Sequence, residues 1–309
     1  MHDIIIIGGG PAGLTAIHYA LRKRLDALLV GNQLGGKTTY HLELPFNEPA
    51  QPILGADIVR QFRAQVEALG FPLHEGTAER IEQADGNFTV HLSDGSQANA
   101  RSIVIATGAQ PVPMGIPGEE TFLGRGVSYS SISYAPLFHH RTVAVIGEAK
   151  VGLRATAELA AYANQVHLVT AATFDPEWPL VNLLRQHSGV TLHSEATPLA
   201  IEGDEYARSL SFERAGETSK LLVDGIFIEQ PLRPNTQMVA HLIDLDERGR
   251  IEVNERNETS LPGCFAAGDV TATYGEQVVI AIGEGAKAAL SAIEYLIHKG
   301  HLYPQLTQA

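Results

Sequence analysis

The chain has 309 residues, a length typical of two domains of about 150 residues each. It holds 22 Lys and Arg against 35 Asp and Glu, and the net charge of −13 argues against a nucleic-acid partner, because an acidic protein repels phosphate backbones. A single cysteine excludes an intrachain disulfide, a CxxC dithiol and a cysteine-cluster metal site. No apolar run approaches the ~18 residues of a membrane span and no signal peptide precedes the first apolar segment, so we expect a cytoplasmic protein without a membrane partner.

The first segment predicts a strand, a glycine turn, a helix and a second strand. Ile4–Ile7 is a continuous apolar run, typical of a strand buried on both faces of a parallel sheet. Gly8–Gly13 is the turn, and the helix has apolar residues at Leu14, Ile17, Leu21 and Leu25. Ala27–Val30 is the second buried strand.

A similar unit recurs in the second half of the chain. Val143–Ile146 leads into a second turn at Gly147–Gly152, then a helix to about Tyr162 and a strand at Val166–Val169. Each unit continues into segments in which polar and apolar residues alternate, interrupted by turn dipeptides. Each unit then ends in an apolar strand, Ile103–Ala106 in the first and Gly225–Ile228 in the second. This repeat predicts two related dinucleotide-type domains.

The order of the remaining segments predicts that the first domain is discontinuous. Gln110–Gly118 and Gln230–Asn235 are rich in Pro and Gly and are the expected crossings between domains. A short strand at Cys264–Ala267 and a last helix at Gln277–His298 follow the second crossing. The helix carries an apolar stripe that we expect to cover the N-terminal sheet, at Val279, Ile282, Ala286, Leu290, Ile293 and Ile297. The expected domains are therefore 1–116 with 241–309, and an inserted 117–240.

The glycines of the first turn have the spacing of a dinucleotide-binding site. Gly8 permits the tight turn, Gly10 lets the backbone approach a pyrophosphate, and Gly13 lets helix and strand pack closely. The pyrophosphate then lies at the positive end of the helix dipole. The acid expected after the second strand is missing, so a ribose contact must come from the backbone or from Asn32.

The chain resembles the low-molecular-weight thioredoxin reductases, flavoproteins of the pyridine nucleotide–disulfide oxidoreductase class. The matching motifs, in the family's order, are Gly8–Gly13, Gly35–Thr39, Ala106–Gly108, Ile116–Glu120, Gly126–Tyr129, Pro234–Thr236, Ala266–Asp269, Gln277–Val279 and Gly283–Ala286. The resemblance implies an α/β fold of two Rossmann-like domains, of the three-layer β/β/α type, with the second inserted into the first.

The resemblance also implies FAD as the cofactor of the first domain. Asp269 would hold the ribityl chain, although the residue types alone also fit an ordinary helix cap there. The backbone of Gln277–Val278 would reach the pyrimidine edge of the flavin, with Glu276 in place of the family's Arg. The residues expected to line the cofactor are Gly8, Gly10, Pro11, Ala12, Gly13, Asn32, Gly36, Lys37, Thr38, Thr107, Gly108, Gly268, Asp269, Glu276, Gln277 and Val278. Flavin neighbours, or simple packing residues, are expected at Tyr40, His41, Tyr129 and Tyr274.

Two functional modules of that family are altered. Ser130 and Ser133 stand in the two positions of the redox cysteines, and a serine hydroxyl forms neither a thiolate nor a disulfide. Cys264 is interpreted as a small buried strand residue, so thioredoxin reduction by the family's route is not expected. No catalytic residue is assigned, and the histidines show no metal-ligand spacing.

The second glycine turn no longer fits a nicotinamide dinucleotide well. Ala149 replaces the glycine that approaches pyrophosphate, and Thr170–Ala172 replaces the family's basic phosphate clamp. Lys150 is either a phosphate-binding point charge or a solvated lysine. NAD(P)H is therefore a doubtful cofactor.

The leading hypothesis is an FAD-dependent oxidoreductase whose flavin exchanges electrons directly with an external partner, a ferredoxin-type protein or a small molecule. The acidic net charge disfavours an acidic ferredoxin, and Arg22–Arg24 is the visible basic cluster. The alternatives are a ferredoxin/flavodoxin–NADP reductase-like enzyme or NADPH oxidase, and a non-catalytic FAD-binding redox sensor. The resemblance further implies a homodimer.

Overall fold

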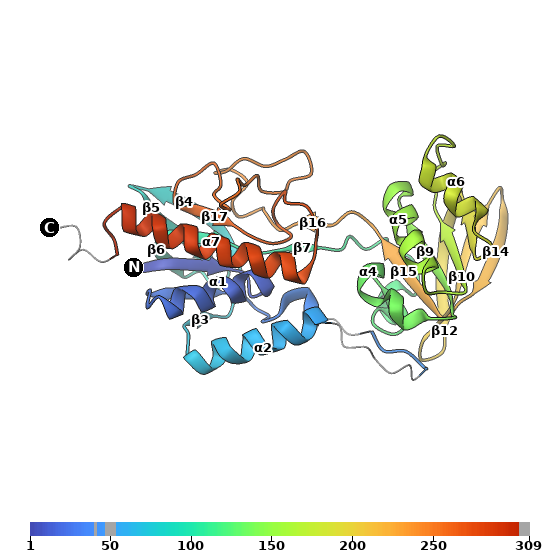
Figure 1. The fold of residues 1–309 in the computed structure, drawn as a ribbon, viewed down its shortest axis with the longest axis horizontal. Helices are drawn as coiled ribbons and strands as arrows, with labels where there is room; N and C mark the ends of the chain where they lie inside the picture. Colours follow the sequence, from blue (N-terminus) through green and yellow to red (C-terminus); the bar gives the residue numbers. More distant parts are fainter. Residues whose placement is uncertain (40–41, 47–53, 303–309) are drawn as a thin grey trace. The chain divides into compact units, whose positions relative to one another are not determined.

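The computed structural model describes residues 1–39, 42–46 and 54–302. The chain forms two compact units, one of Met1–Thr39, Leu54–Gln110 and Arg233–Ala309, the other of Tyr40–Ile53 and Pro111–Leu232 (Figure 1). The first unit ends at Gln110 and resumes at Arg233, a few residues before the boundaries expected at 116/117 and 240/241, and the described residues 42–46, expected in the first domain, belong to the second unit. The reason for the earlier boundaries is a short antiparallel ribbon of β7 (Ala109–Gln110) and β16 (Arg233–Pro234), which closes the first unit where the chain leaves and re-enters it.

The first unit is built on a seven-stranded sheet in the order β3-β2-β1-β6-β5-β4, with β17 also paired to β6. Its strands are β1 (His2–Ile7), β2 (Ala27–Val30), β3 (Leu73–His74), β4 (Ala78–Ala84), β5 (Asn87–Leu92), β6 (Gln97–Ile105) and β17 (Cys264–Ala266). The strands β3, β2, β1, β6 and β17 pair in parallel, whereas β4, β5 and β6 pair antiparallel.

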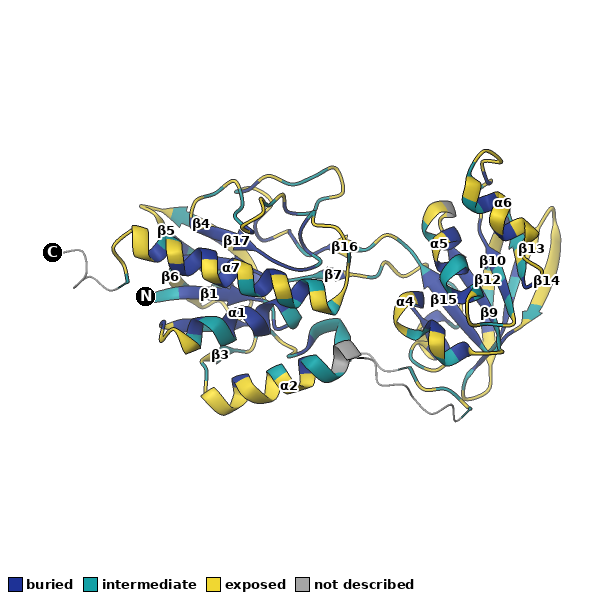
Figure 2. Cartoon of the chain, viewed as in Figure 1, coloured by how far each residue is buried: buried dark blue, intermediate teal, exposed yellow. Residues whose placement is uncertain are grey.

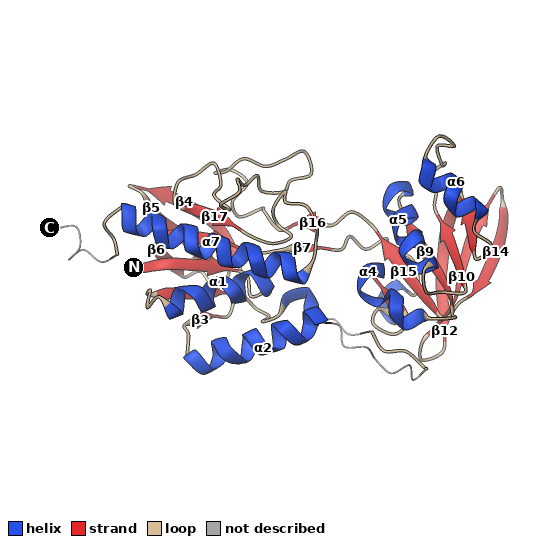
Figure 3. Ribbon diagram, in the orientation of Figure 1, coloured by secondary structure: helices blue, strands red, loops and turns tan. Residues whose placement is uncertain are grey.

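The apolar run of β1 is buried because its side chains enter two different cores. Ile4 and Ile6 face the helices α1 (Pro11–Arg22), α2 (Leu54–Leu69) and α7 (Val278–His298). Ile5 and Ile7 face the core formed with β4, β5 and the 238–251 segment. The helices therefore pack on one side of the parallel strands, and the other side packs against residues of β4, β5 and the 238–251 segment. Figure 3 shows α1, α2 and α7 beside these strands, and Figure 2 shows the parallel strands as largely buried.

The last helix packs on the N-terminal sheet as expected, and Ile293 of the stripe is buried there, but the rest of the expected stripe is not the buried face. Val279, Leu290 and Ile297 are 63%, 46% and 39% exposed, so most of the larger apolar side chains of the stripe do not cover the sheet. The buried face of α7 is instead mostly small, with Ala281, Gly285, Ala288, Ala289, Ser291 and Ala292. Gly285 lies so close to α1 that a Cβ there would overlap the carbonyl oxygen of Ala12. The close crossing of two helices selects small residues for the buried face, and hydrophobicity alone does not reveal it.

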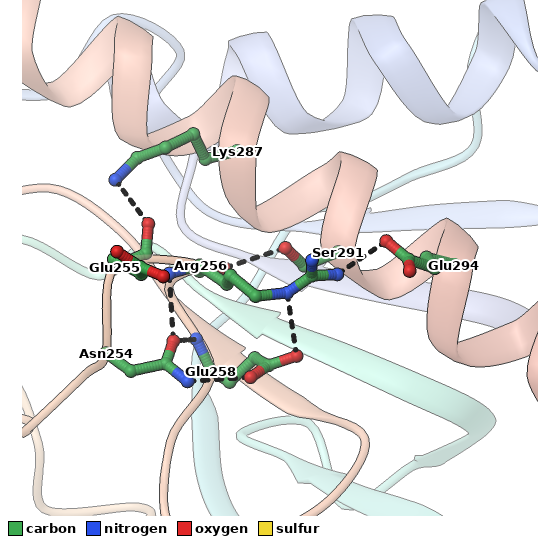
Figure 4. A network of polar contacts seen from close by, with 7 residues as sticks. All are labelled: Asn254, Glu255, Arg256, Glu258, Lys287, Ser291 and Glu294. Atoms are coloured by element: carbon green, nitrogen blue, oxygen red, sulfur yellow. Dashed lines mark hydrogen bonds and ion pairs between the residues drawn. The ribbon is translucent and has the colours of Figure 1, made fainter.

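A polar network attaches α7 to the 254–258 loop of the same unit (Figure 4). The Arg256 guanidinium is paired with Glu258 and Glu294. The Lys287 ammonium donates to the carbonyl oxygen of Glu255 at 2.9 Å, and the Ser291 hydroxyl donates to that of Arg256 at 2.8 Å. These contacts fix the helix to the loop: Lys287 and Glu294 lie on the exposed side of α7, whereas Ser291 belongs to its buried face.

The second unit repeats the parallel arrangement. Its five-stranded sheet has the order β11-β10-β9-β15-β8, all pairs being parallel, and a separate antiparallel sheet has the order β12-β13-β14. The strands are β8 (Val127–Ser128), β9 (Thr142–Gly147), β10 (Gln165–Val169), β11 (Val190–His193), β12 (Ala196–Gly203), β13 (Ala207–Arg214), β14 (Glu217–Leu222) and β15 (Gly225–Glu229). The helices are α3 (Glu119–Phe122), α4 (Ser131–Tyr134), α5 (Ala149–Ala160) and α6 (Pro179–Gln186), with 3-10 turns at Ala135–Phe138 and, in the first unit, Gly36–Thr39.

Within the described parts of the chain, no helix combines the length and apolar character needed to cross a bilayer.

Candidate functional site

The three motif glycines of the first turn, Gly8, Gly10 and Gly13, have different surroundings. A Cβ at Gly8 would overlap the carbonyl oxygen of Ala106, and one at Gly13 would overlap that of Gly8. A Cβ at Gly10 would meet no heavy atom within 4 Å. Gly8 and Gly13 are therefore required by packing, whereas the space in front of Gly10 is open and is the space a ligand would use.

The N-terminus of α1 offers backbone donors to that open space. Gly10 is the N-cap residue in extended conformation, no side chain caps the helix, and Pro11 opens it. The first hydrogen bond of the helix runs from the Leu14 amide to the carbonyl oxygen of Gly10 at 2.8 Å. The preceding amides have no partner in the helix, and the helix dipole adds partial positive charge, so this end suits an anion.

Two other segments converge on the same turn. A Cβ at Gly36, whose φ is +56°, would lie 3.1 Å from the Cα of Gly10. A Cβ at Gly268, whose φ is +80°, would lie 3.2 Å from the Cβ of Ala12. Each glycine is followed by a charged residue, and the Lys37 ammonium and Asp269 carboxylate form an ion pair at 2.7 Å.

The Thr107–Gly108 turn follows β6 on the other side of Gly8 and is held by Asn235. The Thr107 hydroxyl donates to the carbonyl oxygen of Asn235 at 2.6 Å, and the Asn235 amide side chain donates to that of Thr107 at 2.8 Å. The Asn235 backbone amide donates to the carbonyl oxygen of Gly108 at 3.0 Å. The Thr38 hydroxyl donates to the carbonyl oxygen of Gly35 at 2.7 Å, so it stabilises its own turn.

Glu284 is a site residue that sequence reasoning missed. Its side chain lies on the buried face of α7, and the residue is only 4% exposed. One carboxylate oxygen accepts from the Gly268 amide at 2.7 Å and from the Thr271 hydroxyl at 3.4 Å, while Oε1 is buried without a hydrogen-bond partner among the described residues. The available signal was a glutamate placed between two glycines, Gly283 and Gly285, in the expected helix. Glu284 fixes the Gly268 turn that carries Asp269.

The remaining expected cofactor neighbours are less enclosed. Asn32, Glu276 and Gln277 are exposed, and Val278 is half-buried at the start of α7. Tyr274 is 82% exposed. Tyr40 and His41 lie outside the described residues.

In the second unit, Tyr129 belongs to a buried carboxylate centre. Its hydroxyl donates to Glu119 at 2.8 Å. The same carboxylate accepts from the amides of Met114, Gly115 and Ile116. Glu119 thereby organises the segment that follows the first crossing, and Tyr129 has a structural role in it.

Ser130 and Ser133 are close enough to bond to each other. The Ser130 hydroxyl donates to the Ser133 hydroxyl at 2.8 Å, at the start of the short helix α4. The Ser131 amide donates to the Glu229 carboxylate at 2.6 Å. The one cysteine, Cys264, is buried in the other unit, and burial raises the pKa of its thiol to about 12, so it stays protonated and unreactive near neutral pH.

The second glycine turn keeps its packing glycines. A Cβ at Gly147 would overlap the carbonyl oxygen of Glu229, and one at Gly152 would lie 2.8 Å from Cδ1 of Leu168. The position that corresponds to Gly10 is Ala149, where α5 begins. The Lys150 ammonium lies 5.4 Å from the centre of the Trp178 ring. The turn has therefore kept the residues that fold it and lost the glycine that faces a ligand.

Among the described residues, no three His, Cys, Asp or Glu side chains gather as a metal site. His167 and His193 lie on neighbouring strands with ring nitrogens 3.4 Å apart. Burial lowers the pKa of His193 to about 4, so that imidazole is neutral.

The chain is similar to proteins of known function and structure. Residues 2–285 match the family model described as pyridine nucleotide-disulphide oxidoreductase. The alkyl hydroperoxide reductase F protein of Staphylococcus aureus is 33% identical over 300 residues, covering 96% of this chain and 59% of the relative, so the chain spans about three-fifths of that protein's length.

Two solved structures show the same architecture. Thioredoxin reductase from Streptococcus pyogenes has a TM-score of 0.86 at 28% identity, with 96% of this chain and 99% of the other covered. A ferredoxin-flavin thioredoxin reductase from Clostridium acetobutylicum is 30% identical with a TM-score of 0.50, over 96% and 98% of the two chains. The expected α/β fold of two Rossmann-like domains is thus confirmed. The chain belongs to the pyridine nucleotide-disulphide oxidoreductase family, and membership implies FAD as its cofactor.

Proposed function

We propose that the protein is an FAD-dependent oxidoreductase whose flavin exchanges electrons directly with an external donor and acceptor. The observation that carries this proposal is a contrast between the two glycine turns. The first turn keeps open space at Gly10 beside an ion pair of suitable chemistry, whereas the second has lost the equivalent glycine and the redox cysteines are serines.

The residues of the first unit fit FAD. A Cβ would occupy the open space at Gly10, and uncapped amides of α1 point to the same end of the helix, as an approaching pyrophosphate requires. Asp269 would accept from a ribityl hydroxyl, Thr107–Gly108 would line the cofactor, and the Gln277–Val278 backbone would reach the flavin ring. FAD, when bound, supplies one- and two-electron transfer, and the chain supplies its binding and orientation.

An internal disulfide is not part of the proposed reaction. The Ser130 and Ser133 hydroxyls hydrogen-bond to each other, and neither can be oxidised to a disulfide. Cys264 is buried and its raised pKa keeps it a thiol. Thioredoxin is therefore not reduced through a dithiol of this chain.

The proposed electron donor is a ferredoxin-type protein. The second unit lacks the phosphate-facing glycine, so conventional NADPH binding is disfavoured. A relative that is 30% identical carries ferredoxin in its name, which supports a donor of that class. The second candidate is an NADPH-linked reductase or oxidase, which the retained Gly147 and Gly152 and the nearby Lys150 favour.

An anaerobic titration of the FAD-loaded protein tests the proposal. The flavin band near ~450 nm is followed while NADPH, NADH, reduced ferredoxin and dithionite are added in separate experiments. We expect bleaching by dithionite and by reduced ferredoxin, and none at stoichiometric NADPH or NADH. Bleaching by NADPH would replace the proposal with the second candidate, and failure of ferredoxin would remove that donor. A protein that takes up no FAD would overturn the cofactor assignment itself.

A further inference from the structure

Lys37 and Asp269 connect two segments that flank the first turn of α1. A Cβ added at Gly36 would lie 3.1 Å from the Cα of Gly10, and one added at Gly268 would lie 3.2 Å from the Cβ of Ala12. The ammonium and carboxylate that follow these glycines meet at 2.7 Å, and their side chains are 33% and 15% exposed. The pair therefore joins the two segments that approach the first turn of α1, and both side chains are partly shielded from water.

Without a positive partner, the Asp269 carboxylate would weaken the binding of a phosphate group at the N-terminus of α1. An anion at the N-terminus of α1 is stabilised by the helix amides, but a second negative charge nearby repels it. Asp269 faces this conflict if the ligand is a dinucleotide, because it directly follows Gly268, where a Cβ would lie 3.2 Å from the Cβ of Ala12 in the first turn of α1. A lysine ammonium has three donors and acts as a compact point charge, so it can bond a carboxylate and a phosphate oxygen at the same time.

We propose that Lys37 is the residue that makes the site accept a diphosphate beside Asp269. In the described structure its ammonium neutralises the carboxylate, and with a dinucleotide present it also donates to a phosphate oxygen. The inference rests on the proposed FAD site and adds to it the group that selects phosphorylated ligands.

The proposal predicts effects of opposite sign for the two partners. Lys37→Met leaves Asp269 uncompensated next to the phosphates, so affinity for both FAD and ADP falls, by about tenfold or more for a lost charge-assisted bond. Asp269→Asn removes the repulsion while Lys37 stays, so ADP binds more tightly. FAD does not gain in parallel, because the amide is a poorer acceptor for the ribityl hydroxyl than the carboxylate.

The experiment uses the full chain freed of cofactor. FAD affinity is measured by titration with flavin fluorescence, and ADP affinity by displacement of FAD, at low and high salt. The variants are Lys37→Met, Lys37→Arg and Asp269→Asn, with Lys23→Met as a matched control, because Lys23 is an exposed lysine at the opposite end of α1. Thermal unfolding of each variant shows that it is folded.

The expected result is a large loss for Lys37→Met, partial retention for Lys37→Arg, a gain in ADP affinity for Asp269→Asn, and no change for Lys23→Met. The salt dependence of ADP binding is weaker in Lys37→Met than in the wild type, since one screened attraction is gone. Wild-type FAD affinity in Lys37→Met, or no displacement of FAD by ADP, would overturn this inference alone. A wild-type chain that does not bind FAD would overturn the proposed function instead.

Discussion

At the scale of single residues, glycines of one motif have separable roles. Gly10→Ala places a methyl group in the open space at the helix N-terminus, whereas Gly13→Ala drives one into the carbonyl oxygen of Gly8. We expect Gly10→Ala to weaken FAD binding by about tenfold or more, with a loss of stability of about 1 kcal/mol or less, since Ala is a poorer N-cap than Gly. We expect Gly13→Ala to destabilise the fold by about 2–3 kcal/mol, as overpacking does.

Urea unfolding of the apoprotein and FAD titration separate the two effects. The two variants carry the same added methyl group in the same turn, so each is the control for the other. Equal losses of stability in both variants would mean that Gly10 is also a packing glycine, and the open space would then not be the ligand's.

The roles of the motif glycines could be predicted from the sequence, because the residues that each glycine approaches are close in the chain or lie on the adjacent strand. Gly8 meets Ala106 because β1 and β6 pair in register, and both strands are recognisable as apolar runs. The Lys37–Asp269 ion pair could not be assigned that way. It depends on two loops meeting at α1, and no periodicity links residues so far apart in the chain.

At the scale of elements, the helix α7 shows that the larger apolar side chains need not face the core. Its buried face is set by how closely α1 approaches, and Gly285 is the contact point with Ala12. The exposed face keeps Val279, Leu290 and Ile297. The spacing of apolar residues in the sequence does not show how closely two helices approach each other, so it predicts the wrong buried face for α7.

The two glycines of α7 give a matched test of this packing. A Cβ at Gly285 would overlap the Ala12 carbonyl oxygen, whereas one at Gly283 would meet nothing within 4 Å. We expect Gly285→Ala to destabilise the protein by about 1–3 kcal/mol, because α7 must move away from α1. Gly283→Ala should stabilise it by about 0.5–1 kcal/mol through helix propensity. Chemical denaturation measures both, and destabilisation by Gly283→Ala would contradict the orientation of the helix.

At the scale of the whole molecule, the repeat could be recognised because both units are built on a strand, a glycine turn and a helix. Their divergence could be recognised too, since Ala149, Ser130 and Ser133 stand in named motif positions. The sequence predicts the positions of the crossings between the two units less accurately. The β7–β16 ribbon that ends the first unit is two residues long on each side, too short to produce a pattern.

The proposed loss of disulfide chemistry can be tested by restoring it in the full chain. Ser130 and Ser133 already place their hydroxyl oxygens 2.8 Å apart, so the double change Ser130→Cys, Ser133→Cys puts two thiols within reach of a disulfide. We expect the variant to lose both free thiols of this pair on mild oxidation. We also expect its photoreduced flavin to be reoxidised by an added aromatic disulfide faster than in the wild type, because exchange requires a thiolate.

Ser130→Cys alone is the control, since one sulfur cannot form the internal disulfide. If the double variant forms its disulfide but its reduced flavin reacts no faster than the wild-type flavin, the missing thiols are not the whole difference from the dithiol-bearing members. This chain would then have diverged from those members in more than these two side chains. If the rate rises, the replacement of the two cysteines by serines is what prevents the wild-type flavin from passing electrons through an internal dithiol.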